Sequence, residues 1–272
     1  SLGFRVVHET DKAEIFDYLV TRPPKSRIVV FEQAGFEFGV KDIRKASPYI
    51  GLVAVGKDDN SNYAVSAIEE GRSIYKTIKK VILYLFSTSL GETLTIAGAL
   101  LLGYPLPILA AQIIWLNLVT DGFLDVALAM EPKEKGLMRG KFERPKKWIV
   151  DSLMTQRMFL MALPMTIGTL YLFQGYFETD LAKALTISFT TLVVFQWFNA
   201  WNCRSEDKSV FQMNPFSNKF LVGATAIVIY IQFAALYTPF LQKILHTTPL
   251  SISEWLIIIP VASSIILVEE IR

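Results

Sequence analysis

Long apolar runs dominate the chain after Thr77, and polar or charged residues separate one run from the next. A helix needs about 20 predominantly apolar residues to cross the hydrocarbon core of a bilayer. Six segments approach or reach that length, so the pattern predicts six membrane-spanning helices. The predicted spans are residues 78–102, 108–130, 153–173, 183–201, 220–241 and 254–268.

Residues 1–72 show the mixed pattern of a small soluble unit. Residues 11–20 have the apolar spacing of a helix, and Arg27–Phe31 and Ile50–Val55 are short apolar runs typical of strands. Residues 62–80 have a helical pattern that continues into the first span. The expected fold is therefore mainly α, with a six-helix transmembrane bundle in residues 73–272 preceded by a small α/β unit in residues 1–72. About 70 residues make a small core, so we expect this unit to dock elsewhere or to be marginally stable.

Composition agrees with a membrane protein. The 272 residues are 52% hydrophobic and 19% charged, whereas soluble domains carry about 25% charged residues. The single cysteine, Cys203, excludes an internal disulfide and a cysteine-pair metal site. The net charge of +2 gives no indication of a nucleic-acid partner, and none is expected.

The loops between the predicted spans alternate in basic charge, and this predicts the orientation of the chain. The connections 103–107, 174–182 and 242–253 are poor in Lys and Arg, whereas the others are rich in them. We therefore expect the N-terminal region, the basic loops and the C-terminus to be cytosolic, and the membrane to be the plasma membrane if the protein is prokaryotic. The basic residues of the two rich loops are Lys133, Lys135, Arg139, Lys141, Arg144, Lys146 and Lys147, then Arg204, Lys208 and Lys219.

Several predicted spans carry polar side chains on shared helix faces. Ser89 and Glu92 are three residues apart, and Asn117, Thr120 and Asp121 follow an i, i+3, i+4 pattern. An ionisable residue at the bilayer centre costs about 2.5–3.5 kcal/mol on insertion scales, so such residues indicate function. Gln196 and Asn199 share a face in the fourth span, and Ser87 and Thr88 accompany Ser89 in the first.

These side chains offer hard oxygen donors, which suit Ca²⁺, Mg²⁺, Mn²⁺ or alkali ions rather than Cu⁺ or Zn²⁺. Gly91 and Gly122 stand beside Glu92 and Asp121, and we expect them to loosen the helices and free backbone carbonyls as further ligands. Asp125 is left open between a ligand and a residue near the cytosolic end of its span. The remaining hydroxyls are assigned to hydrogen bonds that hold helices together, and they belong to Thr93, Thr95, Ser188 and Thr190.

Two segments resemble the fifth and sixth transmembrane helices of calcium-type P-type ATPases. They are Ser87-Thr-Ser-Leu-Gly-Glu92 and Gln112-Ile-Ile-Trp-Leu-Asn-Leu-Val-Thr-Asp-Gly122, and the Asn-Leu-Val-Thr-Asp-Gly stretch is highly specific. Phe189–Asn199 resembles the eighth helix, Asn214–Lys219 the approach to the ninth, and Ile68–Tyr75 the stalk before the fifth. The resemblance is continuous from about Asp58 to Arg272.

The resemblance implies an ion site and a transported cation, which we expect to be Ca²⁺. Glu92, Asn117, Thr120, Asp121 and Gln196 fall where the family places ion ligands. Ser89 falls at a ligand position where calcium pumps usually have Asn, and Gln196 falls where the sarcoplasmic reticulum member has an acidic residue. Both departures weaken one of that pump's two sites, so a single divalent ion, or a different cation, remains open.

The resemblance fails upstream. The family's phosphorylation motif, Asp-Lys-Thr-Gly-Thr, is absent from the sequence, and Phe31–Gly39 cannot supply the Mg²⁺-binding hinge motif. Residues 1–72 are therefore expected to be a degenerate remnant of a HAD-like phosphorylation domain. We expect no catalytic residue and no resident cofactor in this chain, because Mg-ATP would act only through domains that the sequence does not contain.

Three functions remain open. The chain, which starts at Ser1, is a fragment or half of a pump that contributes the ion-binding membrane domain and pairs with the missing N-terminal half. Alternatively it is a non-catalytic membrane module that regulates or assembles with an intact pump. The third possibility is a cation transporter driven by a gradient, without ATP.

The basic loop between the second and third predicted spans tests the orientation. A cysteine placed at Gly140 should be protected from an impermeant thiol reagent in intact cells, because this loop holds the strongest basic cluster. Labelling from the outside would contradict the predicted orientation.

Overall fold

The computed structural model describes residues 28–32, 51–55, 61–133, 149–206 and 208–271, with side chains described from residue 69 onward. The chain divides into two compact units, Ser1–Arg72 and Ser73–Arg272. In the first unit, strands β1 (Ile28–Glu32) and β2 (Gly51–Val55) pair in parallel, with Ile28 opposite Gly51. The helix expected over residues 11–20 lies outside the described residues, so the α/β character of residues 1–72 stays a prediction.

The described part of the chain is mainly helical, as expected. Helix α3 (Ser61–Leu101) runs without a break through 41 residues, so the predicted continuation into the first span is confirmed. The second span consists of α4 (Ala110–Trp115), the π-helical turn η1 (Leu116–Asp121) and α5 (Gly122–Ala129). The remaining elements are α6 (Ser152–Gln174), α7 (Leu181–Asn202), the short turns η2 (Val210–Gln212) and η3 (Pro215–Ser217), α8 (Lys219–Tyr237), α9 (Pro239–Leu245) and α10 (Ile252–Ile271).

Five helical segments among the described residues are long and apolar enough to cross a membrane. They are Glu69–Leu101, Ala110–Ala129, Leu181–Asn202, Lys219–Tyr237 and Ile252–Ile271. Helix α6 is the sixth predicted span and has 23 residues, but it is not among the five, since Gln156 and Arg157 lower the hydropathy of its first turns. Its assignment as a span stays a prediction.

The predicted ends of the last two spans need correction. The fifth span ends at Tyr237 rather than at residue 241, because Pro239 opens the separate helix α9. Proline lacks the N–H that would continue the preceding helix. The sixth span is longer than predicted, since α10 covers Ile252–Ile271 and contains Pro260 without ending there.

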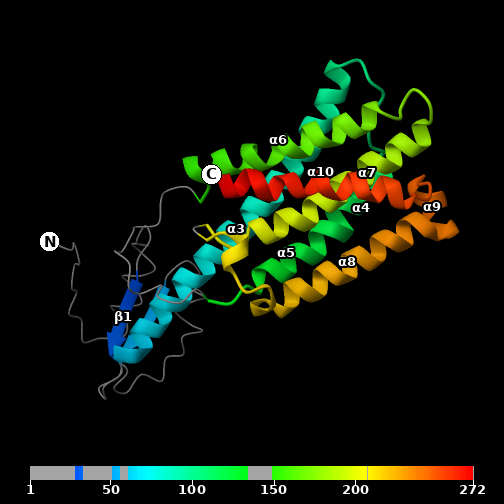
Figure 1. Ribbon diagram of the computed structural model, residues 1–272. Helices are drawn as coiled ribbons and strands as arrows, with labels where there is room; N and C mark the ends of the chain where they lie inside the picture. Colours follow the sequence, from blue (N-terminus) through cyan, green and yellow to red (C-terminus); the bar gives the residue numbers. More distant parts are fainter. Residues whose placement is uncertain (1–27, 33–50, 56–60, 134–148, 207, 272) are drawn as a thin grey trace, which may run out of the picture. The chain divides into compact units, whose positions relative to one another are not determined.

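Helix α7 lies at the centre of the second unit. Its most apolar stretch is 72% buried, against 17% for α10 and 33% for α8. Helices α6 and α10 pack on α7 and on each other, while α5 packs on α8 (Figure 1). This position explains why α7 is apolar over most of its surface, and why its buried amides Gln196 and Asn199 have partners on a neighbouring helix.

Gly168 allows α6 to approach its two neighbours closely. A Cβ atom added there would lie 2.7 Å from Val261 Cγ1 on α10 and 3.0 Å from Phe195 Cζ on α7. Both neighbours are stiff side chains in a packed interface. Any side chain at position 168 would therefore force the helices apart.

We expect Gly168→Ala to destabilise the bundle by about 1–3 kcal/mol, the usual cost of overpacking. Gly223→Ala is the matched control, because an added Cβ at this α8 position meets nothing within 4 Å. Alanine favours a helix over glycine by about 1 kcal/mol, so the control should be neutral or stabilising. Thermal unfolding in detergent measures both, and equal melting temperatures for the two variants would contradict the close packing.

Candidate cation site

The Glu92 carboxylate joins three helical segments within the bundle. Its Oε2 accepts a hydrogen bond from Asn117 Nδ2 at 3.0 Å, and its Oε1 accepts one from Gln196 Nε2 at 2.9 Å. Glu92 lies on α3, Asn117 on η1 and Gln196 on α7, and only 6% of Glu92 is exposed. The structure thus brings together three of the residues that the sequence marked as ion ligands.

Asp121, at the end of η1, is fully buried and held by hydroxyl groups of α3. Tyr84 Oη donates to Asp121 Oδ1 at 2.7 Å, and Thr88 Oγ1 donates to Oδ2 at 3.2 Å. Within the described residues, neither Asp121 nor Glu92 forms an ion pair with a basic side chain. Two buried carboxylates without a basic partner are costly in their charged form, and a bound cation could compensate that charge.

The π-helical turn η1 carries Asn117, Thr120 and Asp121. Such turns widen a helix locally and are frequent at functional sites. The widened turn ends at Asp121, directly before Gly122, where the sequence led us to expect a loosened helix. The same expectation was wrong for Gly91, because α3 is continuous there and the Gly91 carbonyl accepts the Thr95 hydroxyl at 2.7 Å. Gly91 instead makes room for α6, since an added Cβ would lie 2.6 Å from Met165 Sδ.

The other predicted residues differ in their surroundings. Thr120 is buried beside Asp121, whereas Ser89 is exposed and makes none of the hydrogen bonds that hold Glu92 or Asp121. Asp125 Oδ1 is buried without a hydrogen-bond partner among the described atoms. Among the described residues, no three His, Cys, Asp or Glu side chains gather closely enough to hold a metal ion by themselves. A cation here would therefore depend on amides and hydroxyls as well as on the two carboxylates.

Tyr84 is the contact that the sequence analysis missed. It stands four residues before Thr88 and is fully buried, so the two share the face of α3 that meets Asp121. The i, i+4 spacing could have indicated it. Helix α3 is also linked to α7, by the hydrogen bond from Asn199 Nδ2 on α7 to Ser87 Oγ on α3 at 2.7 Å.

The four hydroxyls that the sequence assigned to hydrogen bonds between helices differ in their partners. Thr93 and Thr95 donate to carbonyls four residues earlier in α3, which links turns of one helix rather than two helices. Thr190 accepts a hydrogen bond from Gln232 Nε2 on α8 at 3.4 Å, which is the contact between helices that the sequence predicted. Ser188 Oγ is buried and has no hydrogen-bond partner among the described atoms.

A second buried polar cluster ties together the ends of α5, α7 and α8. Arg204 Nη2 and Nε donate to the Glu131 carboxylate at 2.9–3.2 Å, and Asn218 Nδ2 donates to Glu131 Oε2 at 2.7 Å. Arg204 is 2% exposed and also stacks on Trp201, 5.2 Å from the ring centre. Because every charge in the cluster has a partner of opposite charge or an amide, its geometry is that of a structural clamp.

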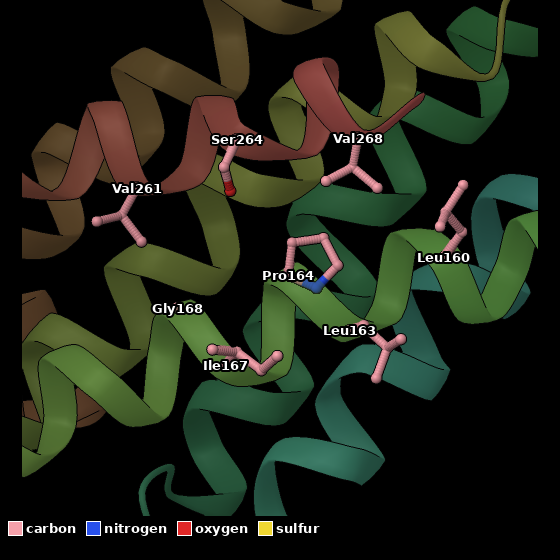
Figure 2. Close-up of a pocket in the computed structure, with 8 residues that line it drawn as sticks. All are labelled: Leu160, Leu163, Pro164, Ile167, Gly168, Val261, Ser264 and Val268. Atoms are coloured by element: carbon pink, nitrogen blue, oxygen red, sulfur yellow. The ribbon is translucent and has the colours of Figure 1, made fainter. Parts of the chain in front are cut away.

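An apolar pocket lies away from these polar groups, between α6 and α10. Figure 2 shows Pro164, Ile167 and Gly168 of α6 opposite Val261, Ser264 and Val268 of α10. The lining offers a single hydroxyl and no charged group, so it provides no ligands for a cation.

Buried carboxylates and amides on apolar helices define the class of the protein: it is a multi-pass membrane protein with an internal polar site. Residues 105–272 match the family model described as "Cation transporting ATPase, C-terminus", and the chain belongs to this family. It is 38% identical over 229 residues to a "Calcium-transporting ATPase" of Bacillus subtilis, covering 83% of this chain and 25% of that protein.

Other relatives carry similar names. The chain is 36% identical over 220 residues to "Calcium-transporting ATPase type 2C member 1" of Homo sapiens, covering 79% of this chain and 24% of the relative. It is 32% identical over 222 residues to "Calcium-transporting ATPase 1" of Saccharomyces cerevisiae, covering 79% of this chain and 23% of that relative. The chain thus spans about a quarter of the length of the curated relatives it matches.

The Glu131–Arg204 clamp yields a stability prediction. Arg204→Met should destabilise the chain by about 3–5 kcal/mol, because it leaves the Glu131 carboxylate buried without its partner. Adding Glu131→Gln should recover much of that loss, since the neutral amide needs no counter-charge. Thermal unfolding of the parent, both single variants and the double variant completes a double-mutant cycle. Strictly additive changes in the free energy of unfolding would show that Glu131 and Arg204 are not coupled.

Proposed function

We propose that this chain is the membrane domain of a calcium-type P-type ATPase and binds the transported cation between α3, η1 and α7. The observation that carries the proposal is the position of Glu92, whose carboxylate accepts one amide hydrogen bond from η1 and one from α7. The matching helices of a pump must hold an ion between them, and these contacts bring the required oxygen-bearing side chains within reach of one another.

The proposed ligands are Glu92, Asn117, Thr120, Asp121 and Gln196. Gln196 Oε1 is buried and accepts no hydrogen bond within the described residues, so this carbonyl oxygen is available to a cation. The Asn117 amide lies on the other side of the same carboxylate. Ser89 and Asn117 are both exposed, but only Asn117 donates a hydrogen bond to Glu92, so the role of Ser89 as a ligand stays a prediction.

The charge of the proposed site suits one divalent ion. Glu92 and Asp121 supply two carboxylates, and the neutral amides and the Thr120 hydroxyl complete a set of hard oxygen donors. Ca²⁺ takes six to eight oxygen ligands, more than these side chains provide, so water or other parts of a whole pump would complete the shell. Names of the relatives support Ca²⁺ as the cation.

The energy-coupling steps lie outside this chain in the same proposal. Phosphoryl transfer requires a nucleophilic Asp and Mg²⁺ ligands that neutralise developing charge. The sequence contains no Asp-Lys-Thr-Gly-Thr motif. We therefore propose that the 272-residue chain does not hydrolyse ATP by itself, that residues 1–72 are the remnant of a phosphorylation domain, and that both termini are cytosolic.

A melting series in detergent tests the ion site. Ca²⁺ or Mn²⁺ should raise the melting temperature more than K⁺ does, because ligand binding stabilises the folded state by mass action. At a free cation concentration ten times the dissociation constant, the free energy of unfolding rises by about 1.4 kcal/mol. This corresponds to a rise of a few degrees in the melting temperature. Asp121→Asn should abolish the shift, since it removes one of the two carboxylates.

Thr95→Ala is the matched control, because Thr95 is equally buried and its hydroxyl bonds only the Gly91 carbonyl of its own helix. It should melt at a different temperature but keep the cation-dependent shift. A shift that survives Asp121→Asn and disappears in Thr95→Ala would refute the ligand assignment. The absence of any shift in the parent chain would favour the non-catalytic regulatory function.

A further inference from the structure

The segment between α7 and α8 exposes three aromatic side chains. Phe211, Phe216 and Phe220 are 75%, 71% and 63% exposed, and they lie within ten residues of one another. Isolated exposed apolar residues are normal on a protein surface. Three phenylalanines close together in sequence indicate instead a surface that is covered in the native environment.

Hydrogen bonds hold this 208–220 segment in a defined shape. Ser209 Oγ and the Val210 N–H donate to Glu270 Oε1 of α10 at 2.8 and 2.9 Å. Arg204 Nη2 donates to Ser217 Oγ at 2.6 Å, and Asn218 Oδ1 accepts from the Leu221 N–H at the start of α8. The phenylalanines are therefore presented by a braced segment, fixed to the end of α10 and the start of α8.

The segment continues the lipid-facing side of α8. Phe220, Ile227, Tyr230 and Tyr237 are exposed and recur at helical spacing, while Leu221 and Val228 face the bundle and are buried. Because α8 is apolar enough to cross a membrane, its exposed stripe meets lipid. Phe220 lies at the end of this stripe, and the exposed Phe211 and Phe216 precede it in the chain.

Two exposed lysines stand at the ends of the same segment. Lys208 precedes η2, and Lys219 begins α8. Exposed basic residues beside apolar side chains are the pattern of surfaces that lie in the interface of anionic membranes. The charge indicates anionic phospholipid as the partner rather than a zwitterionic lipid.

We propose that residues 208–220 form an interfacial anchor: Phe211, Phe216 and Phe220 insert at the headgroup–acyl boundary, and Lys208 and Lys219 contact anionic phospholipid headgroups. The anchor fixes the depth of the α8 end, which the Glu131–Arg204 clamp connects to α5 and thus to the helix that carries Asp121. This inference does not depend on the identity of the transported cation.

A spin label measures the insertion directly. Phe216→Cys in the full chain is labelled with a nitroxide and reconstituted in vesicles of phosphatidylglycerol and phosphatidylcholine; the parent, whose Cys203 is fully buried, gives the background. Collisions with oxygen should exceed collisions with a water-soluble nickel chelate. The reverse order would place the segment in water and overturn the proposal, and protection from both reagents would overturn it in favour of a covering protein surface.

Lipid preference is tested by thermal unfolding in detergent with either lipid added. Phosphatidylglycerol should raise the melting temperature of the parent more than phosphatidylcholine does, and Lys208→Gln with Lys219→Gln should remove the difference. Lys243→Gln is the control, because Lys243 is exposed on α9, in a different loop. A difference that persists in the double variant, or that Lys243→Gln removes, would overturn the assignment of the anionic contact.

Discussion

Polar groups inside a bilayer must find their partners within the protein, and this constraint shapes most of the second unit. Water is absent from the hydrocarbon core, so a carboxylate, amide or hydroxyl on a span is costly unless another helix satisfies it. Glu92 meets amides from η1 and α7, and Asp121 meets hydroxyls from α3. The polar residues therefore determine which helices are neighbours, while the apolar residues determine how closely they pack.

The central position of α7 follows from the same constraint. This helix contributes Gln196 and Asn199, and both donate hydrogen bonds to α3. Its other sides pack against α6 and α10. Gly168 on α6 has no side chain, and this allows the close contact between α6 and its two neighbours. A helix with polar partners on one side and close packing on the others has almost no surface for lipid, which agrees with its burial.

The two kinds of polar cluster differ in their state of charge balance. Glu131 and Arg204 neutralise each other at the end of the bundle, and Asn218 completes the clamp. Glu92 and Asp121 lie among neutral donors, and among the described residues neither has a basic partner. The balanced cluster holds the ends of the helices together, whereas we propose that the unbalanced one exchanges its hydrogen-bond partners for a cation.

Much of this protein was determined by its sequence alone. The apolar runs indicated the helices, the i, i+3 and i+4 spacing put Asn117, Thr120 and Asp121 on one stretch of helix, and the Asn-Leu-Val-Thr-Asp-Gly stretch indicated the family that residues 105–272 match. Such features are local, because length, periodicity and composition act within one segment. For the same reason the sequence placed Ser89 with Glu92, although spacing along a helix does not tell which side of that helix meets a neighbour.

Only the tertiary structure decided the contacts between segments. The sequence could not show that Gln196, 104 residues after Glu92, donates a hydrogen bond to the Glu92 carboxylate. It also could not show that the Tyr84 hydroxyl donates one to Asp121. It also could not separate the two glycines: Gly91 serves a close helix contact, whereas the helix departs from α geometry just before Gly122. These outcomes depend on how helices distant in sequence pack together, and packing is a property of pairs of surfaces that no single segment contains.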